Sequence, residues 1–203
     1  MKLSHILYKV DNLEKEVKKW QEDGFIVEYG KKHNPYNALI YFKEGPFIEL
    51  FTFNGLPKFI NTILILLGRR KFVEKMEFWA NHPEGLLSIM LENYDDNLDK
   101  ELAILKEHDL TAVLSNKVRI DTKNRKLKFK VAFVNDINFP DLMTYFSLCP
   151  KPKINIHPNN ILGVESIAIG LDSKQKEIFN LICDDEKIKV FEGKGIKDLK
   201  WLK

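Results

Sequence analysis

A strand-like segment recurs three times along this chain of 203 residues. Its copies read KLSHI at residues 2–6, GLLSI at residues 85–89 and GVESI at residues 163–167. An acidic turn and an amphipathic helix pattern follow each copy, which indicates that one supersecondary unit is used repeatedly. The repeat limits the possible folds more than any single motif does, because repeated units bury their apolar faces against one another.

A polar residue occupies the same place in each copy of the repeat. His5 stands in the first copy where Ser88 and Ser166 stand in the other two. A polar side chain at a matching position on otherwise apolar strands suggests that these strands line a shared cleft.

The first unit, residues 1–55, predicts the order β-α-β-β-β. A strand pattern at residues 3–10 is followed by Asn12, a good N-cap residue, and by apolar residues at helical spacing. Gly24 then stands where helices commonly end. Three further strands are predicted at residues 25–28, 38–42 and 47–51.

The second unit, residues 85–150, repeats nearly the same order. A strand over residues 86–91 leads into a helix whose inward-facing leucines run from Leu98 to Leu105. The remaining strands are predicted at residues 118–121, 126–134 and 142–148, the first two as a hairpin.

Residues 151–203 predict a partial third unit. It has a strand over residues 163–171, a helix that ends near Cys183, and two short strands at residues 187–191 and 198–202. Such a unit can complete an edge of the sheet, cover the cleft or form a dimer face.

A helical insert at residues 56–84 separates the first two units. Its first part, residues 59–67, is strongly apolar, and Phe72, Met76 and Trp79 then recur at helical spacing. Three interpretations are open. The insert is a linker packed on the sheets, a mobile cover over the cleft, or a membrane-surface helix with Arg69 and Arg70 at the headgroups.

Composition excludes several classes of protein. The net charge of +3 is too small to indicate nucleic-acid binding. The longest apolar run, residues 59–67, is about half of the roughly 20 residues that a membrane-spanning helix needs. Cys149 and Cys183 have no metal-like spacing, and no signal peptide precedes the first strand, so we expect a reduced, cytoplasmic protein.

His5 and Glu49 are the first candidates for chemistry. Each lies on a predicted strand between apolar residues that share its face. A carboxylate in apolar surroundings needs a partner, and a histidine on a nearby strand can supply one. The same two side chains suit a divalent ion such as Zn, Mn, Fe or Ni. A metal site and a simple buried hydrogen-bonded pair both remain open.

Three segments of the first unit resemble the vicinal oxygen chelate superfamily, which comprises glyoxalases, bleomycin-resistance proteins and dioxygenases. These segments are residues 3–13, 37–42 and 45–51. The motif His157-Pro158-Asn159 is similar to one found in the glyoxalase-like subgroup. The resemblance implies an α+β fold in which paired βαβββ modules form a curved mixed sheet around a cleft, here with a partial third module.

The resemblance also implies site residues. Metal-dependent members use a first-strand histidine and a last-strand glutamate from each module, which gives His5 and Glu49 here, with Glu49 as the catalytic residue. Ser88 and Thr144 stand at the corresponding places in the second module. Hydroxyls are weak ligands, so this departure argues against glyoxalase I-type or extradiol dioxygenase activity. His157 is the candidate third ligand.

Four further residues are predicted to contact a small organic ligand. Asn37 stands just before a strand, where the subgroup carries an asparagine whose amide can both donate and accept hydrogen bonds. Tyr41 is a candidate aromatic wall of the cleft, with packing in the core as the other interpretation, and Ser88 and Thr144 are candidate polar contacts.

Two functions are therefore expected. The first is a metal-dependent lyase, isomerase or dioxygenase that acts on a small molecule. The second is a metal-free binding or resistance protein of the same fold, in which Glu49 can also act as a general base. The resemblance raises the expectation of a homodimer.

Overall fold

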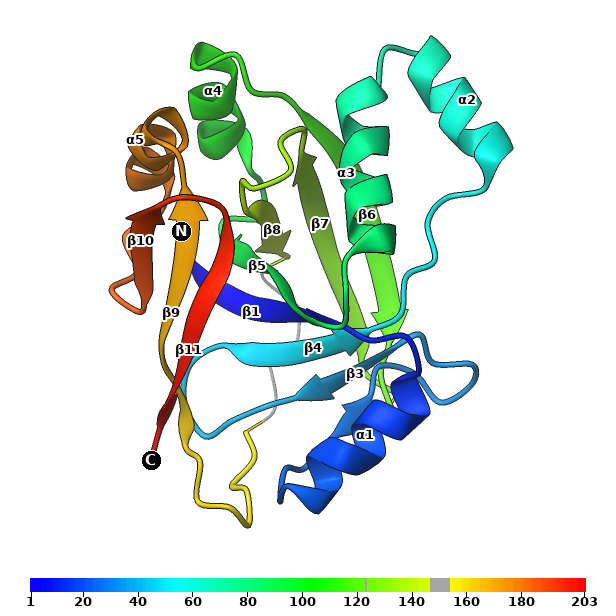
Figure 1. The fold of residues 1–203 in the computed structure, drawn as a ribbon, viewed down its shortest axis with the longest axis vertical. Helices are drawn as coiled ribbons and strands as arrows, with labels where there is room; N and C mark the ends of the chain where they lie inside the picture. The colour runs from blue at the N-terminus through cyan, green and yellow to red at the C-terminus, as the bar shows by residue number, and fades with distance from the viewer. Residues whose placement is uncertain (123, 147–153) are drawn as a thin grey trace.

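The computed structural model describes residues 1–122, 124–146 and 154–203. It contains an eight-stranded mixed sheet, a three-stranded sheet and five helices within these ranges (Figure 1). The predicted α+β class with a curved mixed sheet is confirmed. The predicted strand end at residues 147–148, Cys149 and the boundary between the second and third units lie outside the described residues.

The first half of the large sheet has the predicted order. It comprises β1 (Lys2–Lys9), α1 (Leu13–Glu22), β2 (Glu28–Tyr29), β3 (Asn37–Ile40) and β4 (Phe47–Phe51). The Asn12 side chain caps α1 by accepting from the Lys15 N–H at 2.9 Å. β2 begins later than predicted because Phe25 closes the helix, its N–H donating to the Trp20 carbonyl at 3.0 Å.

The second half comprises β5 (Gly85–Asn93), α4 (Asp99–Glu107), β6 (Ala112–Ile120), β7 (Lys126–Val134) and β8 (Asp141–Tyr145). The strand order across the whole sheet is β2-β3-β4-β1-β5-β8-β7-β6, and the antiparallel pair β1–β5 joins the halves. β6 is longer than predicted. It pairs with β7 along its full length at the sheet edge, where polar residues are tolerated.

The insert forms two helices with different environments. α3 (Arg70–Asn81) packs Phe72, Met76 and Trp79 into an apolar cluster with residues of β1, β4 and β5. α2 (Lys58–Leu66) has no buried residue and projects beside α3 (Figure 1). Of the three interpretations of the insert, packing on the sheet therefore describes α3. No helix in the described ranges is both long and apolar enough to cross a membrane.

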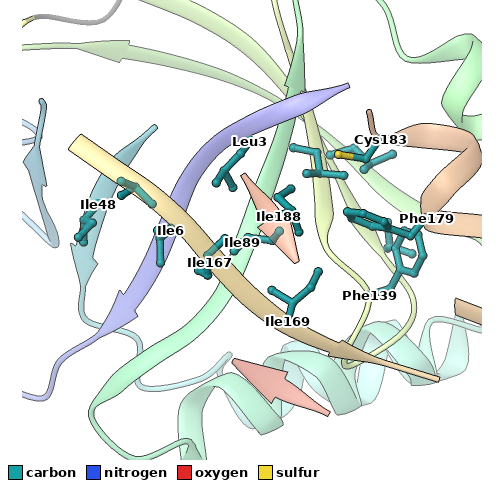
Figure 2. Packing of buried hydrophobic residues seen from close by; sticks show 14 of the residues in the cluster. Leu3, Ile6, Ile48, Ile89, Phe139, Ile167, Ile169, Phe179, Cys183 and Ile188 are labelled. Atoms are coloured by element: carbon teal, nitrogen blue, oxygen red, sulfur yellow. The ribbon is translucent and has the colours of Figure 1, made fainter. Parts of the chain in front are cut away.

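The third unit packs on the face of the sheet opposite α3. It comprises β9 (Gly163–Leu171), α5 (Ser173–Ile182), β10 (Ile188–Glu192) and β11 (Gly195–Leu202), with the sheet order β10-β9-β11. Ile167 and Ile169 of β9 join one core cluster with Ile6, Ile48 and Ile89 of the large sheet (Figure 2). Over its described residues, 154–203, this unit therefore covers the outer face, and neither extends the large sheet nor covers the cleft.

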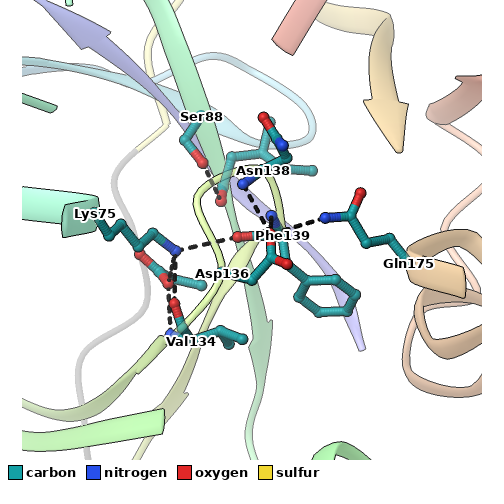
Figure 3. A network of polar contacts seen from close by, with 9 residues as sticks. Lys75, Ser88, Val134, Asp136, Asn138, Phe139 and Gln175 are labelled. Atoms are coloured by element: carbon teal, nitrogen blue, oxygen red, sulfur yellow. Dashed lines mark hydrogen bonds and ion pairs between the residues drawn. The ribbon is translucent and has the colours of Figure 1, made fainter. Parts of the chain in front are cut away.

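A buried polar network fixes α3 to the second half of the sheet. Lys75 of α3 reaches the carbonyl oxygens of Val134 and Phe139 (Figure 3). It also donates to the carboxylate of Asp141. Since α3 also carries Met76 and Trp79, this network sets the position of one wall of the cleft described next.

Candidate functional site

A cleft of about 360 Å³ opens between α3 and the inner face of the large sheet. Both halves of the sheet contribute to it. The first half supplies the polar side chains His5, Asn37 and Glu49, and the second half supplies mainly apolar ones, among them Met90 and Met143. The volume is within the usual range for a small-molecule site.

The structure brings His5 and Glu49 together. His5 Nε2 lies 3.3 Å from Glu49 Oε2, and the two side chains are 5 % and 19 % exposed. β1 and β4 run parallel, so that His5 lies opposite Phe47, and its ring stacks on the Phe47 ring at 4.6 Å. The Glu49 carboxylate is the more accessible of the two groups.

Asn37 orients the Glu49 carboxylate. Its Nδ2 donates to Glu49 Oε1 at 2.7 Å from the neighbouring strand β3. Asn37 is itself buried, and its Oδ1 has no hydrogen-bond partner among the described residues. Gly30 faces this amide, and a Cβ at that position would collide with Asn37 Oδ1. Asn37 thus holds one carboxylate oxygen and leaves Oε2 directed toward His5.

Ser4 and Glu92 orient His5 from the other side. Ser4 Oγ donates to Glu92 Oε2 at 2.6 Å, and His5 Nδ1 lies 3.0 Å from Ser4 Oγ. A serine hydroxyl has one proton, so with Glu92 ionised this network places the His5 proton on Nδ1 and leaves a lone pair on Nε2. That lone pair faces a carboxylate oxygen, which is a favourable arrangement only when a proton or a cation lies between the two acceptors.

Burial keeps His5 neutral. Desolvation lowers the pKa of His5 from 6.5 to about 4, the Glu49 charge opposes this change, and the Arg119 charge adds to it. Burial also raises the pKa of Glu92. A neutral imidazole with a free Nε2 is the form in which histidine binds a metal or accepts a proton.

Ser88 and Thr144 do not line this cleft. In the antiparallel pairing of β1 with β5, Met90 is the residue opposite His5. On β8, Met143 and Tyr145 face the cleft, so Thr144 between them points the other way and is fully buried. Ser88 lies in a separate small cavity with Phe78 and His82. Neither residue therefore lines the cleft that contains His5 and Glu49.

His157 is also remote from the His5–Glu49 pair. Its Nδ1 accepts a hydrogen bond from the Ile26 N–H at 2.9 Å, and its ring packs against Phe25 and Phe42 at 5.3 and 5.0 Å. The ring is buried in the core and does not line the cleft that contains Glu49. Within the described ranges, no group of three His, Cys, Asp or Glu side chains is arranged to hold a metal ion.

Tyr41 lies behind the cleft wall. It is 6 % exposed and packs against the Phe47 ring at 5.0 Å, and Phe47 rather than Tyr41 contacts the cleft. Burial raises the pKa of the Tyr41 hydroxyl.

A family model described as "Glyoxalase-like domain" matches residues 3–180. The chain belongs to the glyoxalase-like domain family. The resemblance to the vicinal oxygen chelate superfamily is confirmed. No curated protein matches the chain.

Solved structures share the fold of this glyoxalase-like chain at low sequence identity. A hypothetical protein from Staphylococcus aureus is 14 % identical with a TM-score of 0.61, and the match covers 96 % of this chain and 87 % of that one. The Mn(II)-bound glyoxalase from Novosphingobium aromaticivorans is 9 % identical with a TM-score of 0.56, over 98 % and 64 % of the two chains. These matches show the fold alone.

Two cations of the glyoxalase-like chain complete the site, and the sequence did not point to them. Lys117 and Arg119 of β6 line the same cleft as His5 and Glu49. Their spacing of two residues was the available signal, since alternate residues of a strand share a face. The strand predicted from the sequence begins at residue 118 and therefore leaves out Lys117, whereas β6 begins at Ala112.

Proposed function

We propose that the protein binds a small organic molecule in this cleft and that Glu49 exchanges a proton with it. One observation carries the proposal. The Glu49 carboxylate is held through one oxygen by Asn37 and lies 3.3 Å from His5 through the other, yet remains 19 % exposed in a mainly apolar cleft of about 360 Å³. A carboxylate positioned in this way serves as a general base when a proton comes within hydrogen-bond reach.

The reaction class that suits this arrangement is proton abstraction from a carbon next to a carbonyl group. Glu49 would take the proton, and the electrons of the C–H bond would move to the carbonyl oxygen to give an enolate. Return of the proton to the same or the adjacent carbon would complete an epimerisation or isomerisation. We therefore prefer lyase or isomerase activity to dioxygenase activity, because the cleft contains a positioned base, Glu49.

Hydrogen–deuterium exchange tests this proposal without knowledge of the natural substrate. Pyruvate, hydroxyacetone and dihydroxyacetone would be incubated with the protein in D2O, and loss of the signal of the protons next to the carbonyl followed by NMR. The parent protein should accelerate exchange of at least one compound, and Glu49→Gln should abolish the acceleration. Glu14→Gln on the exposed surface of α1 is the matched control and should behave as the parent. Equal exchange by the parent and Glu49→Gln, or no acceleration for any compound, would overturn the proposal.

A divalent ion on His5 and Glu49 is the second candidate. His5 Nε2 and Glu49 Oε2 are 3.3 Å apart, and two ligands of a tetrahedral zinc ion are about 3.4 Å apart. Ser4 and Asn37 support the two donors as outer-shell groups do in metal sites. A bound ion would act as a Lewis acid on the ligand's carbonyl oxygen. Catalytic sites usually have three protein ligands, so oxygen atoms of the bound molecule would have to complete this one.

Elemental analysis decides between the two candidates. Protein purified without chelator or metal-affinity resin would be assayed for Zn, Mn, Fe and Ni, together with His5→Ala, Glu49→Gln and the control His157→Gln. Stoichiometric metal in the parent and the control but in neither site variant would support the metal site. The Mn(II)-bound state of the Novosphingobium glyoxalase makes manganese the first ion to examine. An absence of metal from the parent, or equal content in all variants, would contradict the metal candidate.

A binding or resistance protein without chemistry is the remaining alternative. It would show ligand-dependent stabilisation and no proton exchange. The cytoplasmic location and the homodimer stay predictions. The exposed apolar side chains of α2, such as Phe59 and Leu66, make the oligomeric state worth measuring by sedimentation.

A further inference from the structure

We infer that the cleft selects an organic anion, whose charged group lies against Arg119 while its apolar part lies on the methionine-rich wall. The inference rests on the proposed use of the cleft and deepens it by naming the class of ligand. Arg119 is the specificity-determining residue, and Lys117 adds to the same positive field.

The sheet register places both cations at one side of the cleft. β6 is the edge strand, and on it Lys117 lies opposite Phe129 of β7. Arg119 lies two residues farther along, so both side chains share the face that Phe129 presents to the cleft. Glu49 enters the same cleft from β4 in the other half of the sheet. The cavity therefore has cations on one side and a carboxylate base on another.

Arg119 has no acidic partner in the part of the chain that the structure describes. Its Nε is buried without a hydrogen-bond partner there, and no carboxylate lies within ion-pair distance of its guanidinium group. Arg125, in the same hairpin, pairs with Asp121 at 2.7 Å. A buried donor without a partner is costly, so the unmet donor of Arg119 indicates that a bound group satisfies it.

The Tyr41 hydroxyl, a neighbour of Arg119, is neutral at ordinary pH. Burial raises the pKa of the Tyr41 hydroxyl, and Arg119 is the strongest influence against that rise, which places the guanidinium close to Tyr41. A tyrosine hydroxyl cannot neutralise the charge of an arginine. The guanidinium fork matches a carboxylate or a phosphate, which can accept two parallel hydrogen bonds.

The part of the cleft beside these cations suits an apolar group of variable shape. Met90 and Met143 form a cluster with Val131 and Tyr145 on the inner face of the sheet. Methionine side chains adapt to ligands of different shape. A cavity of about 360 Å³ with one charged side and this wall fits a small amphipathic anion. For the proposed reaction, the natural class is a carbonyl compound that carries a carboxylate or phosphate.

Tryptophan fluorescence gives a direct test because Trp79 lines the cleft. The probes are 4-phenylbutyrate, its neutral amide 4-phenylbutanamide, and 3-phenylpropyl phosphate. The parent should bind at least one of the two anions at least about tenfold more tightly than the amide, as expected for hydrogen bonds between charged groups. The tighter anion identifies carboxylate or phosphate as the preferred group.

Variants of the hairpin separate Arg119 from general charge effects. Arg119→Met should remove the preference for the anion and leave amide binding unchanged, and Arg119→Lys should restore part of it. Lys128→Met is the matched control. It removes one positive charge from an exposed position of β7 that does not line the cleft, and should bind as the parent does. Equal binding of anions and amide by the parent, no binding of any probe, or an unchanged preference in Arg119→Met would overturn the inference.

The exchange experiment distinguishes this inference from the proposed function. In one outcome, the parent exchanges the protons of neutral hydroxyacetone with D2O as fast as those of the anion pyruvate, and both exchanges are abolished in Glu49→Gln. That result would support proton transfer by Glu49 and contradict the selection of anions. If Arg119 governs anion binding and no carbonyl compound exchanges, anion selection stands and proton transfer fails.

Discussion

Lys75 and Asp141 form an ion pair in which neither side chain has exposed surface. Lys75 Nζ lies 2.5 Å from Asp141 Oδ1 and 3.1 Å from the carbonyl oxygens of Val134 and Phe139. All three donors of the ammonium group are thus satisfied. Asp141 Oδ1 also accepts the Val134 N–H at 2.8 Å. The pair links α3 to β8, and thereby holds Met76 and Trp79 at the cleft.

Loss of Lys75 should be strongly destabilising. Lys75→Met leaves a buried carboxylate without its cation, and we expect the free energy of unfolding in urea to fall by about 3–5 kcal/mol. Asp141→Asn in the Lys75→Met background should recover part of this loss, because the amide is neutral and its oxygen still accepts the Val134 N–H. A loss below about 1 kcal/mol in Lys75→Met, or no recovery in the double variant, would contradict this account.

Gly30 should be required for the position of Asn37. A methyl group at residue 30 would collide with Asn37 Oδ1, so Gly30→Ala should displace the amide from Glu49 and lower the melting temperature. Removal of the amide in the double variant Gly30→Ala/Asn37→Ala relieves the collision. We therefore expect the cost of Gly30→Ala, measured by thermal unfolding, to be smaller in the Asn37→Ala background than in the parent. Equal costs in the two backgrounds would show that the contact is unimportant.

His5 should make stability depend on pH. Burial lowers its folded-state pKa from 6.5 to about 4, so the unfolded chain takes up this proton first as the pH falls. The stabilisation is complete above pH 6.5 and is lost as the pH falls toward 4, with a total of roughly 3 kcal/mol. In chelator-treated protein, the stability difference between the parent and His5→Gln should shrink by about this amount between pH 7 and pH 4. A difference that is constant over this range would show that His5 titrates normally.

His157 should matter for stability and not for the site. His157→Leu leaves the partly buried Ile26 N–H without its acceptor, and we expect a loss of about 1 kcal/mol in the free energy of unfolding. Metal content, anion binding and proton exchange should equal those of the parent once folding is confirmed by circular dichroism. A loss of metal or of exchange in the folded variant would return His157 to the site.

Much of the fold was predictable because it depends on local pattern. The repeated strand segment, the Asn12 cap and the helical spacing of Phe72, Met76 and Trp79 all follow from periodicities of two or 3.6 residues. His5 and Glu49 were paired correctly for the same reason, since each lies on a short apolar strand and a buried carboxylate requires a partner.

The tertiary structure decided the features that depend on register and on contacts distant in sequence. The pairing of β1 with β5 places Met90 opposite His5 and Ser88 opposite Leu7, and Ser88 lines a cavity separate from the cleft. His157 accepts a hydrogen bond from the N–H of Ile26, which lies 131 residues away in the sequence. Arg119 reaches the cleft only because the edge strand β6 pairs with β7. Sequence alone therefore predicted the order of the elements in the two halves of the sheet and the proximity of His5 and Glu49. The partners across the cleft depended on how the two modules pair and pack, which no local periodicity encodes.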